Sequence, residues 1–302
     1  MPSQDYRCGF IALVGRPNVG KSTLLNRLVG QKISITSRRP QTTRHRIIGI
    51  KTLESAQLIY VDTPGLHRYS GRAMNRQMNR TASMALQDVD VVVFLVEGLR
   101  WTADDDLVLS ELERLECPVI LAVNKVDLIA GKEALLPGLQ ALSRKRAFAH
   151  IIPLSAHKGD NVAELQTCVE ALLPFFAPFF PEDQVTDRSE RFLVAERIRE
   201  KLFRKLTREL PYGLSVEVEH FRHEGNIIHI HALIWVERQS QKAIVIGKQG
   251  AVLHDIGQQA RIEIEDMLES KVNLKLWVKV KEGWADDERA LKSLGYSDDR
   301  LA

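Results

Sequence analysis

The residues best placed to do chemistry lie near the start of the chain, where Gly15, Gly20, Lys21 and Ser22 match the pattern G-x-x-x-x-G-K-[ST]. The glycines let backbone N–H groups curl around phosphate oxygens, and the helix that begins here directs its positive end toward them. Lys21 adds charge near the β and γ phosphates, and Ser22 offers a hydroxyl to Mg²⁺. A turn that binds nothing is disfavoured because the pattern follows an apolar strand and opens a helix. We expect phosphate contacts from Gly15, Asn18, Val19, Gly20, Lys21, Ser22 and Thr23.

A second apolar run ends in the sequence D-T-P-G, which fits the pattern D-x-x-G. Asp62 would hold Mg²⁺ through a water molecule, and the N–H of Gly65 would contact the γ-phosphate. Four residues are a weak signal alone. Their position at the carboxyl end of a strand that follows the first motif strengthens the prediction, because α/β sheets bind ligands at that edge.

The sequence N-K-V-D at the end of another apolar run predicts which base is bound. A carboxylate accepts hydrogen bonds from guanine N1–H and its exocyclic amine, whereas adenine presents an acceptor at N1, so Asp127 selects guanine. Asn124 would tie the base edge to the loop, and Lys125 would lie across the ring. Ser155 and Ala156, after the next strand, would close over the base. The predicted nucleotide is GTP.

Residues 36–46 join the first helix to the strand before Asp62, and they contain threonines, four arginines and no acidic residue. Such a loop suits a segment ordered by the γ-phosphate and Mg²⁺. Thr43, or failing that Thr42, is the expected metal ligand. The arginines Arg38, Arg39, Arg44 and Arg46 could contact RNA or phosphate, or the loop could simply be solvated, and the sequence does not choose between these.

Leu66 follows Gly65 at the position where many GTPases have the glutamine that orients the attacking water. Leucine cannot orient water, so we expect slow hydrolysis unless another group or a partner completes the site. His67 is a neighbouring candidate with little support, and we assign no catalytic residue.

The elements that must position these residues alternate along the first half of the chain. Short β-branched runs at 10–14, 58–61, 91–96, 119–123 and 151–154 are typical of buried parallel strands. Helical spacing at 21–28, 74–86, 107–115 and 162–173 separates or follows them. This pattern predicts an α/β P-loop NTPase domain with a mostly parallel sheet and helices on both faces.

A proline-rich segment follows and ends the first domain, because closely spaced prolines cannot continue a helix. Its four phenylalanines are expected to pack between two domains, with a membrane contact as the alternative; they are Phe175, Phe176, Phe179 and Phe180. A basic helical stretch at 192–210, strands at 214–221 and 227–236, a helical pattern at 251–268 and a strand at 272–280 come next. The order α-β-β-α-α-β predicts a smaller α+β domain.

Within that second domain, the sequence G-K-Q-G at 247–250 joins two apolar-patterned segments. A G-x-x-G loop lets a nucleic-acid backbone approach closely, and Lys248 could contact a phosphate. The pattern alone is very weak, but the surrounding order of elements supports it. The basic stripe from Arg197 to Arg208 could face RNA, anionic lipid or only solvent.

Length and composition exclude several classes of protein. The 302 residues suit two domains, and 44% hydrophobic with 27% charged residues is typical of a globular chain. The net charge is only +3, and from Glu182 onward 20 basic residues face 22 acidic ones, so overall charge does not indicate RNA. Three scattered cysteines suggest neither a disulfide framework nor a zinc site. With no apolar run of membrane-spanning length and no secretory signal at 1–7, a cytoplasmic protein is expected.

Taken with their surroundings, these motifs resemble the bacterial Era GTPases over essentially the whole chain. The resemblance is carried by GRPNVGKSTLLN, QTTRHR, DTPGLH, NKVD, VIGKQG and the terminal LWVKVKEGWADDERALKSLGY. A single P-loop followed by one KH-like domain distinguishes this pattern from relatives with two GTPase domains. The apolar residue in place of the water-orienting glutamine is also similar to that family.

The resemblance implies a GTP-binding G domain at 1–175, a linker at 176–190 and a type II KH domain at 191–302 that includes a C-terminal tail. It implies GTP and Mg²⁺ as ligands, and RNA contacts from Gly247, Lys248, Gln249 and Gly250. The partners it implies are the 3′ end of 16S ribosomal RNA and the 30S subunit, whose maturation and assembly the protein would assist. A monomer with partial, peripheral association at the inner membrane is expected. Because the second domain is not net basic, RNA affinity must come from Lys248, its neighbours and base contacts.

Two other functions remain as alternatives. A membrane-associated regulatory GTPase without RNA binding would use the basic helix and the phenylalanine-rich linker. A metabolic or RNA-modifying enzyme that uses GTP is disfavoured because no further catalytic constellation is present, and an ATP-dependent kinase would not explain Asp127.

Overall fold

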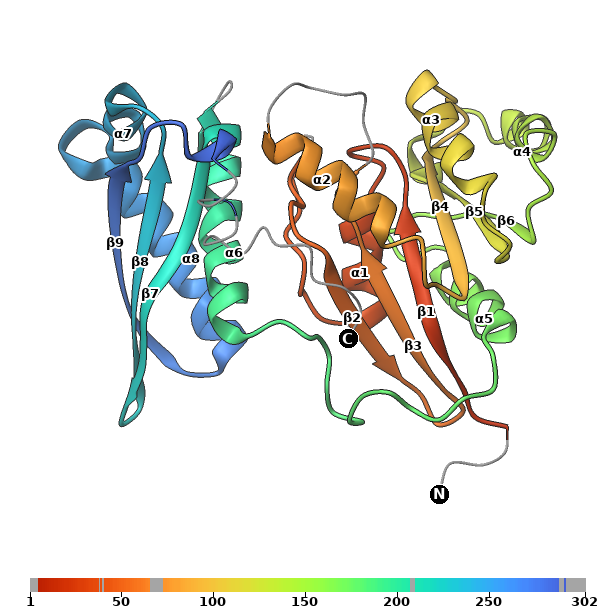
Figure 1. Ribbon diagram of the computed structural model, residues 1–302, viewed down its shortest axis with the longest axis horizontal. Helices are drawn as coiled ribbons and strands as arrows, with labels where there is room; N and C mark the ends of the chain where they lie inside the picture. Colours follow the sequence, from red (N-terminus) through yellow and green to blue (C-terminus); the bar gives the residue numbers. More distant parts are fainter. Residues whose placement is uncertain are drawn as a thin grey trace.

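The computed structural model describes residues 5–37, 39, 41–65, 73–206, 210–287 and 291. It contains a six-stranded sheet with helices on both faces and a three-stranded sheet with helices on one face, joined by an extended connection (Figure 1). Leu66 and His67 lie outside the described residues, as do Arg38 and Arg208.

The larger sheet has the strand order β2-β3-β1-β4-β5-β6. All neighbours pair in parallel except β2 and β3, which are antiparallel. The strands are β1 (Arg7–Val14), β2 (Ile47–Thr52), β3 (Ala56–Asp62), β4 (Val91–Glu97), β5 (Val119–Asn124) and β6 (His150–Pro153). The carboxyl ends of β1, β3, β4 and β5 therefore lie along one edge, where the sequence motifs begin.

Helices cover both faces of this sheet, as predicted. One core contains apolar residues of α1 and α5, and the other contains residues of α2, α3 and α4. The helices are α1 (Lys21–Val29), α2 (Ala73–Met84), α3 (Ala103–Leu112), α4 (Leu135–Ser143) and α5 (Val162–Leu172). Sequence patterns missed β2 and α4. Gly49 lies within β2, where α1 packs closely against the strand, and a β-carbon there would lie 2.7 Å from Leu25 Cδ1.

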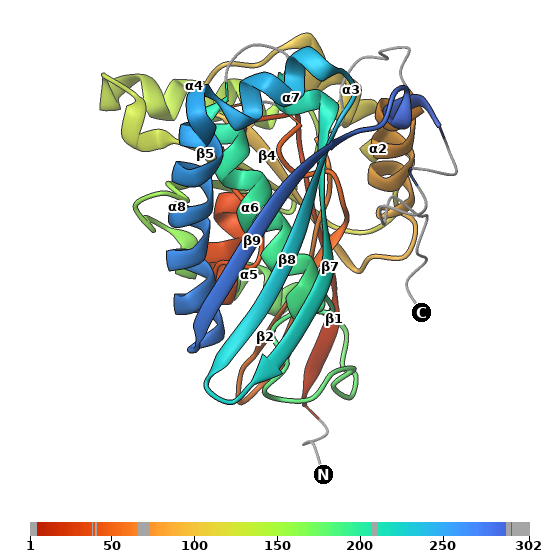
Figure 2. The same cartoon turned by 90° about the vertical axis from the view of Figure 1, so that its left-hand side faces the viewer.

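The second unit has the predicted order of elements. They are α6 (Glu190–Lys205), β7 (Leu214–Glu224), β8 (Ile227–Val236), α7 (Gln239–Ile246), α8 (Ala251–Leu268) and β9 (Lys271–Val280). β7 and β8 are antiparallel, whereas β8 and β9 are parallel. Inward-facing residues of the sheet and apolar residues of α6, α7 and α8 form one core. In Figure 2 the three strands lie side by side, with α6 and α8 behind and beside them.

The connection between the two units runs along the larger sheet. Cys8 N donates to Pro174 O at 3.1 Å, and Ile50 N donates to Val185 O at 2.8 Å. The prediction that the four phenylalanines pack between the domains is wrong. Phe175, Phe176 and Phe179 are 58%, 55% and 50% exposed, and only Phe180 packs against the small cluster around Cys8. The backbone hydrogen bonds hold the segment beside β1 and β2, which places these rings away from the second unit.

The two units meet through α6, which faces α1 and the loop after it (Figure 1). A second contact lies near the end of the described chain, where Trp284, Ala285 and Leu291 form a buried cluster with Ala73, Met74 and Met78 of α2. Within the described residues, no helix is both long and apolar enough to cross a membrane.

Candidate functional site

The P-loop, which is the G-x-x-x-x-G-K-[ST] segment at 15–22, lies between β1 and α1. Its glycines have positive φ angles that residues with a side chain rarely adopt. Gly20 has a φ of 106°, and a β-carbon there would lie 2.3 Å from the Nδ2 atom of Asn124. Lys21 is buried and its Nζ donates to the carbonyls of Gly15 at 2.8 Å and Arg16 at 3.1 Å. Burial lowers the pKa of Lys21 to about 8. The ammonium group is therefore held inside the loop, where a phosphate would offset its desolvation.

Three side-chain oxygens suited to a magnesium ion meet beside the P-loop. Ser22 Oγ lies 2.6 Å from Thr43 Oγ1 and donates to Asp62 Oδ2 at 2.7 Å. Asp62 is fully buried, and this burial raises its pKa although Lys21 and the hydroxyl donors oppose the change. Hydroxyl and carboxylate oxygens are the donors that Mg²⁺ prefers, so this set fits the ion. Ser34, which sequence analysis missed, also donates to Asp62 Oδ2 at 3.0 Å.

The two threonines proposed as alternatives lie differently. Thr43 faces Ser22, whereas Thr42 Oγ1 donates to the carbonyl of Arg39 at 2.8 Å and lies 2.6 Å from Ser37 Oγ. Thr42 thus stabilises the loop itself, and the geometry favours Thr43 for a metal.

Gly65 brings the end of β3 close to the P-loop. A β-carbon at Gly65 would lie 2.7 Å from the backbone nitrogen of Pro17, so only glycine allows this approach. The D-x-x-G segment and the P-loop therefore form adjoining walls of one site.

The predicted guanine residues meet at the ends of β5 and β6. Asn124 Nδ2 donates to Val19 O at 2.7 Å, and Asn124 Oδ1 accepts from Ala156 N at 2.9 Å. Asn124 therefore joins the P-loop to the loop after β6, and its amide is occupied by these two contacts. Ser155 Oγ accepts from Lys158 N at 3.1 Å, which fixes the same loop. Asp127 is half-buried, and the described residues give its carboxylate no hydrogen-bond partner.

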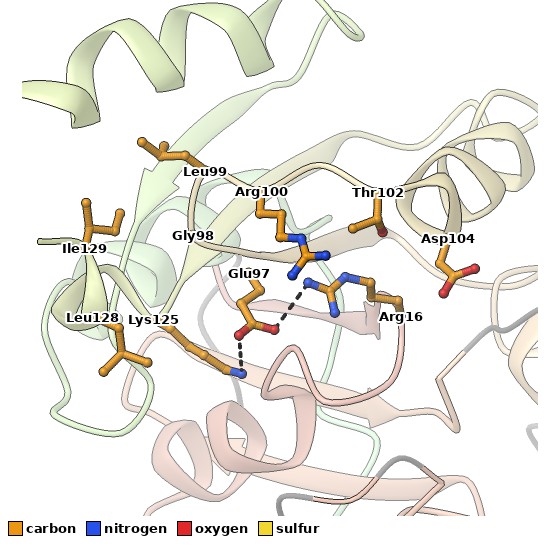
Figure 3. Close-up of a pocket in the computed structure, with 10 residues that line it drawn as sticks. All are labelled: Arg16, Glu97, Gly98, Leu99, Arg100, Thr102, Asp104, Lys125, Leu128 and Ile129. Atoms are coloured by element: carbon orange, nitrogen blue, oxygen red, sulfur yellow. Dashed lines mark hydrogen bonds and ion pairs between the residues drawn. The ribbon is translucent and has the colours of Figure 1, made fainter.

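Beside these residues lies an ion-pair cluster that the sequence did not predict, in which Glu97 lies between Arg16 and Lys125 (Figure 3). Glu97, at the end of β4, pairs with Arg16 Nη2 at 3.2 Å and with Lys125 Nζ at 3.0 Å. Burial alone would raise the pKa of Glu97, but Lys125 and Arg16 lower it below its usual value. These three residues line a pocket of about 380 Å³ beside the nucleotide site. Glu97 thereby links Arg16 of the P-loop to Lys125 of the N-K-V-D segment.

The loop that carries Thr43, residues 32–46, is fastened to the second unit at both ends. At its start, Lys32 Nζ pairs with Glu200 of α6 at 2.6 Å and with Glu263 of α8 at 2.8 Å. Glu200 is buried and also accepts from the backbone N–H of Thr36 at 3.0 Å. Arg197 donates to the carbonyl of Lys32. We call this set of contacts the loop anchor.

The residues on both sides of Thr43 are also bound by the second unit. Arg199 of α6 donates to the carbonyl of Thr42 at 2.6 Å. Arg44 donates to the carbonyls of Leu214 at 2.8 Å and Tyr212 at 3.1 Å, at the start of β7. We include these contacts in the loop anchor. Thr43, the predicted metal ligand, thus lies between two residues, Thr42 and Arg44, that are each hydrogen-bonded to the second unit.

The first part of the basic stripe of α6 therefore has a different role from those predicted, whereas Arg204 and Lys205 are exposed. Arg197, Arg199 and Lys201 are buried, so among the described residues the stripe does not present them to RNA, lipid or solvent. Glu196 and Glu200 in the same helix, with Glu263 of α8, compensate their charges. Arg44 is likewise buried, and its guanidinium donates to backbone carbonyls of the second unit. The sequence signal for this burial was the presence of Glu196 and Glu200 about one helical turn from basic residues, because buried charges require partners of opposite charge.

The G-x-x-G loop joins α7 to α8 with strained backbone conformations. Gly247 has φ 74° and ψ 176°, a region that only glycine readily adopts, and Gln249 has a φ of 53°. A β-carbon at Gly247 would lie 2.4 Å from Val252 Cγ2, whereas one at Gly250 would meet nothing within 4 Å. Lys248 and Gln249 are exposed between the two glycines. The loop offers open backbone and one cation to a ligand.

Comparison with known proteins gives one family match in the first structural unit and one in the second. A model of the 50S ribosome-binding GTPase family matches residues 10–125, and a model of the KH domain matches residues 209–285. GTPase Era of Marinobacter nauticus is 61% identical over 294 residues, covering 97% of this chain and 96% of that protein. GTPase Era of Yersinia pestis is 58% identical over 293 residues, with 97% of each chain covered.

Two solved structures match nearly the whole chain. One is an Aquifex aeolicus Era variant bound to GDP and AlF₄⁻, with a TM-score of 0.92, 37% identity, and coverage of 96% of this chain and 99% of that one. The other is Era in complex with MgGDPNP and nucleotides 1506–1542 of 16S ribosomal RNA. Its TM-score is 0.93 at 36% identity, with 97% of this chain and 99% of that one covered.

Proposed function

The chain belongs to the family of the Era GTPases, and from this premise we propose how its residues bind GTP, hold RNA and couple the two. The protein is a GTPase that uses Mg²⁺, binds the 3′ end of 16S ribosomal RNA and assists assembly of the 30S subunit. The observation that carries the nucleotide assignment is the meeting of Ser22, Thr43 and Asp62 beside a P-loop, with Asp127 at the same edge of the sheet.

At the phosphates, the backbone of Gly15 to Gly20 and the start of α1 would surround the β-phosphate, with Lys21 beside the β and γ phosphates. Ser22 and Thr43 would bind Mg²⁺ directly, and Asp62 would do so through a water molecule. Held by these residues, Mg²⁺ would offset the negative charge that develops on the phosphate oxygens during hydrolysis. Gly65 N–H would contact the γ-phosphate.

At the base, the Asp127 carboxylate would accept from guanine N1–H and its amine, and the stem of Lys125 would cover the ring. Asn124 and Glu97 act as positioning residues, since their own contacts are with the protein. Hydrolysis is proposed to be slow, because Leu66 replaces a water-orienting glutamine.

For RNA, we propose the loop at 247–250 as the clamp within a KH domain at 191–302, after a G domain at 1–175 and a linker at 176–190. The exposed backbone of the two glycines would receive the RNA backbone, and Lys248 would contact a phosphate. The related Era complex with a 16S ribosomal RNA segment supports RNA binding by this chain.

The loop anchor supports a switch mechanism. GTP and Mg²⁺ would order the loop around Thr43, and Arg44, Arg199 and Glu200 would transmit that order to the KH domain. RNA would then be held in the GTP state and released after hydrolysis.

Peripheral association with the inner membrane is a further part of the proposal. Phe175, Phe176 and Phe179 form an exposed aromatic patch, and the Arg7 guanidinium lies 4.3 Å from the Phe175 ring centroid. Exposed apolar rings beside a cation suit the interface of an anionic bilayer. Flotation with anionic vesicles should recover wild-type protein but not the Phe175→Ser, Phe176→Ser double variant, and equal recovery would exclude the patch.

The function itself is tested by measuring GTP turnover and RNA binding in the same preparations. Ser22→Ala should lose Mg²⁺-dependent turnover, whereas Ser110→Ala, an exposed hydroxyl on α3, should match wild type. Full turnover in Ser22→Ala would refute the metal site.

A further inference from the structure

The three-stranded sheet of the second unit has one face without a helix among the described residues. The core helices pack on the other face, where Ile228, Ile230 and Ile234 point inward. Side chains alternate along a strand, so the residues between them point outward. We call this outward surface the open face; its residues on β8 and β9 include His229, His231, Trp235, Asn273, Lys275, Trp277 and Lys279, whereas Leu233 has an outward position but is fully buried. In Figure 2 the strands that carry it cross in front of α6.

Aromatic rings cross the open face from strand to strand. The His220 and His231 ring centroids are 4.8 Å apart, and those of His231 and Trp277 are 5.1 Å apart. Trp277 is 44% exposed, which is unusual for so large a ring. Trp235 lies four residues beyond His231 on β8, and its Nε1 donates to Glu217 Oε2 at 3.0 Å. The rings are thus held by neighbours while part of their surface remains accessible.

Lysines border these rings on the β9 side. Lys275 and Lys279 alternate with Trp277 on the outward positions of β9, and Lys279 and Lys281 lie 5.9 and 5.8 Å from the Trp235 ring centroid. Desolvation, together with the positive charges of His220 and Lys275, lowers the pKa of His231. No outward residue of β8 or β9 within the described range is acidic; the acids lie on β7.

We propose that the open face binds a single-stranded segment of RNA, as a second surface separate from the loop at 247–250. Bases would stack on Trp277 and His231, and the RNA backbone would follow the lysines of β9. Sheet-borne aromatic residues bordered by cations are a general means of binding single strands, because every base has a stacking face. The chemistry argues against a protein partner, since lysine is depleted in protein interfaces.

The contacts between the two units leave this surface available. Among the residues that the structure describes, these contacts run through α6, Glu263, the start of β7 and the cluster around Trp284, and none of them uses Trp277 or Lys275. A strand of RNA held at the G-x-x-G loop could therefore continue around the β9 edge onto the open face without displacing the G domain.

The test uses the full chain and two RNA lengths that share one sequence from the 3′ end of 16S ribosomal RNA. An oligonucleotide of about 6 nucleotides fills a four-nucleotide clamp, and one of about 16, extended in either direction, can also reach a second surface. Fluorescence anisotropy at fixed salt gives both affinities for wild type and Trp277→Ala. Loss of one stacked base should weaken the long RNA about 5-fold to 100-fold and leave the short RNA unchanged.

Matched variants separate this proposal from loss of fold and from nonspecific charge effects. Trp277→Phe should restore most of the affinity, and Lys275→Glu should weaken the long RNA, whereas Arg114→Glu, an exposed charge reversal on the G domain, should not. GTP turnover without RNA should stay at the wild-type rate in all four. Equal affinity of wild type and Trp277→Ala for the long RNA would overturn the proposal. It would also be overturned if Trp277→Ala lost binding to anionic vesicles but kept its affinity for RNA. Failure of wild type to bind either RNA would instead refute RNA binding by the protein.

Discussion

Replacing the buried pair Glu196 and Arg199 by methionine tests how the KH domain acts on the loop that carries Thr43. Arg199 is 1% exposed, and its guanidinium binds both oxygens of Glu196, at 2.7 and 2.6 Å, and the Thr42 carbonyl at 2.6 Å. Burial alone would raise the pKa of Glu196, but Arg199 holds it below its usual value, so both groups are charged.

The expected magnitudes follow from what each variant leaves unpaired. Arg199→Met alone leaves a buried carboxylate without its partner, which costs about 3–5 kcal/mol of folding free energy. The double variant removes both charges, and replacing a buried ion pair by apolar residues is often neutral. It still deprives the Thr42 carbonyl of its donor, which costs about 1–3 kcal/mol if that oxygen stays buried. The double variant should therefore be more stable than the single one and weaken the loop anchor selectively.

Urea unfolding measures the two stabilities, and titration with a fluorescent GTP analogue, with and without an rRNA 3′-end oligonucleotide, measures the coupling. About 1.4 kcal/mol lost from the anchor would reduce the effect of RNA on GTP affinity up to about tenfold. The reasoning fails if the folded double variant keeps the wild-type response to RNA. It also fails if the single variant is as stable as the double one.

Three further predictions concern the base, the interface and the RNA loop. Asp127→Asn should shift nucleotide preference from GTP toward xanthosine triphosphate, and unchanged GTP affinity in a competition assay would refute the guanine assignment. Burial alone would raise the pKa of Glu263, but hydrogen bonds from Lys201 and Lys32 lower it to about 2 from 4.5, so its contribution to stability is present above pH 4.5 and is lost as the pH falls through about 2. Glu263→Gln should accordingly be less stable than wild type in urea above pH 4.5, and a gap that does not close in acid would contradict this. Lys248→Glu should weaken RNA binding and reduce the slope of log affinity against log salt by about 0.7, and an unchanged slope would exclude a phosphate contact.

Sequence patterns predicted the G domain well because its signals are local. Buried parallel strands are continuous apolar runs, and the motifs follow them directly, so their meeting at one sheet edge could be expected. The short strand β2, whose apolar run in the sequence is broken by Gly49, and the helix α4 lacked a clear period and were missed. The order of elements in the second unit was also predicted, because its helices and strands likewise give local patterns in the sequence.

The contacts between the units were not predictable in this way. Arg197 and Arg199 look solvent-exposed in sequence, because a charged residue is buried only when a partner elsewhere compensates it. Those partners include Lys32 O and Thr42 O, more than 150 residues away along the chain. The phenylalanine-rich linker was misplaced similarly, since backbone hydrogen bonds to Cys8 and Ile50 decide its course.

The most direct test of the proposed switch is the affinity of the wild-type protein for an rRNA 3′-end oligonucleotide, measured with a nonhydrolysable GTP analogue and with GDP at the same salt and Mg²⁺ concentrations. Coupling through the loop anchor predicts at least about 5-fold tighter RNA binding in the GTP-analogue state. Equal affinity in the two states would contradict it, because contacts that hold Thr43 on both sides could not then carry information between the nucleotide and the RNA.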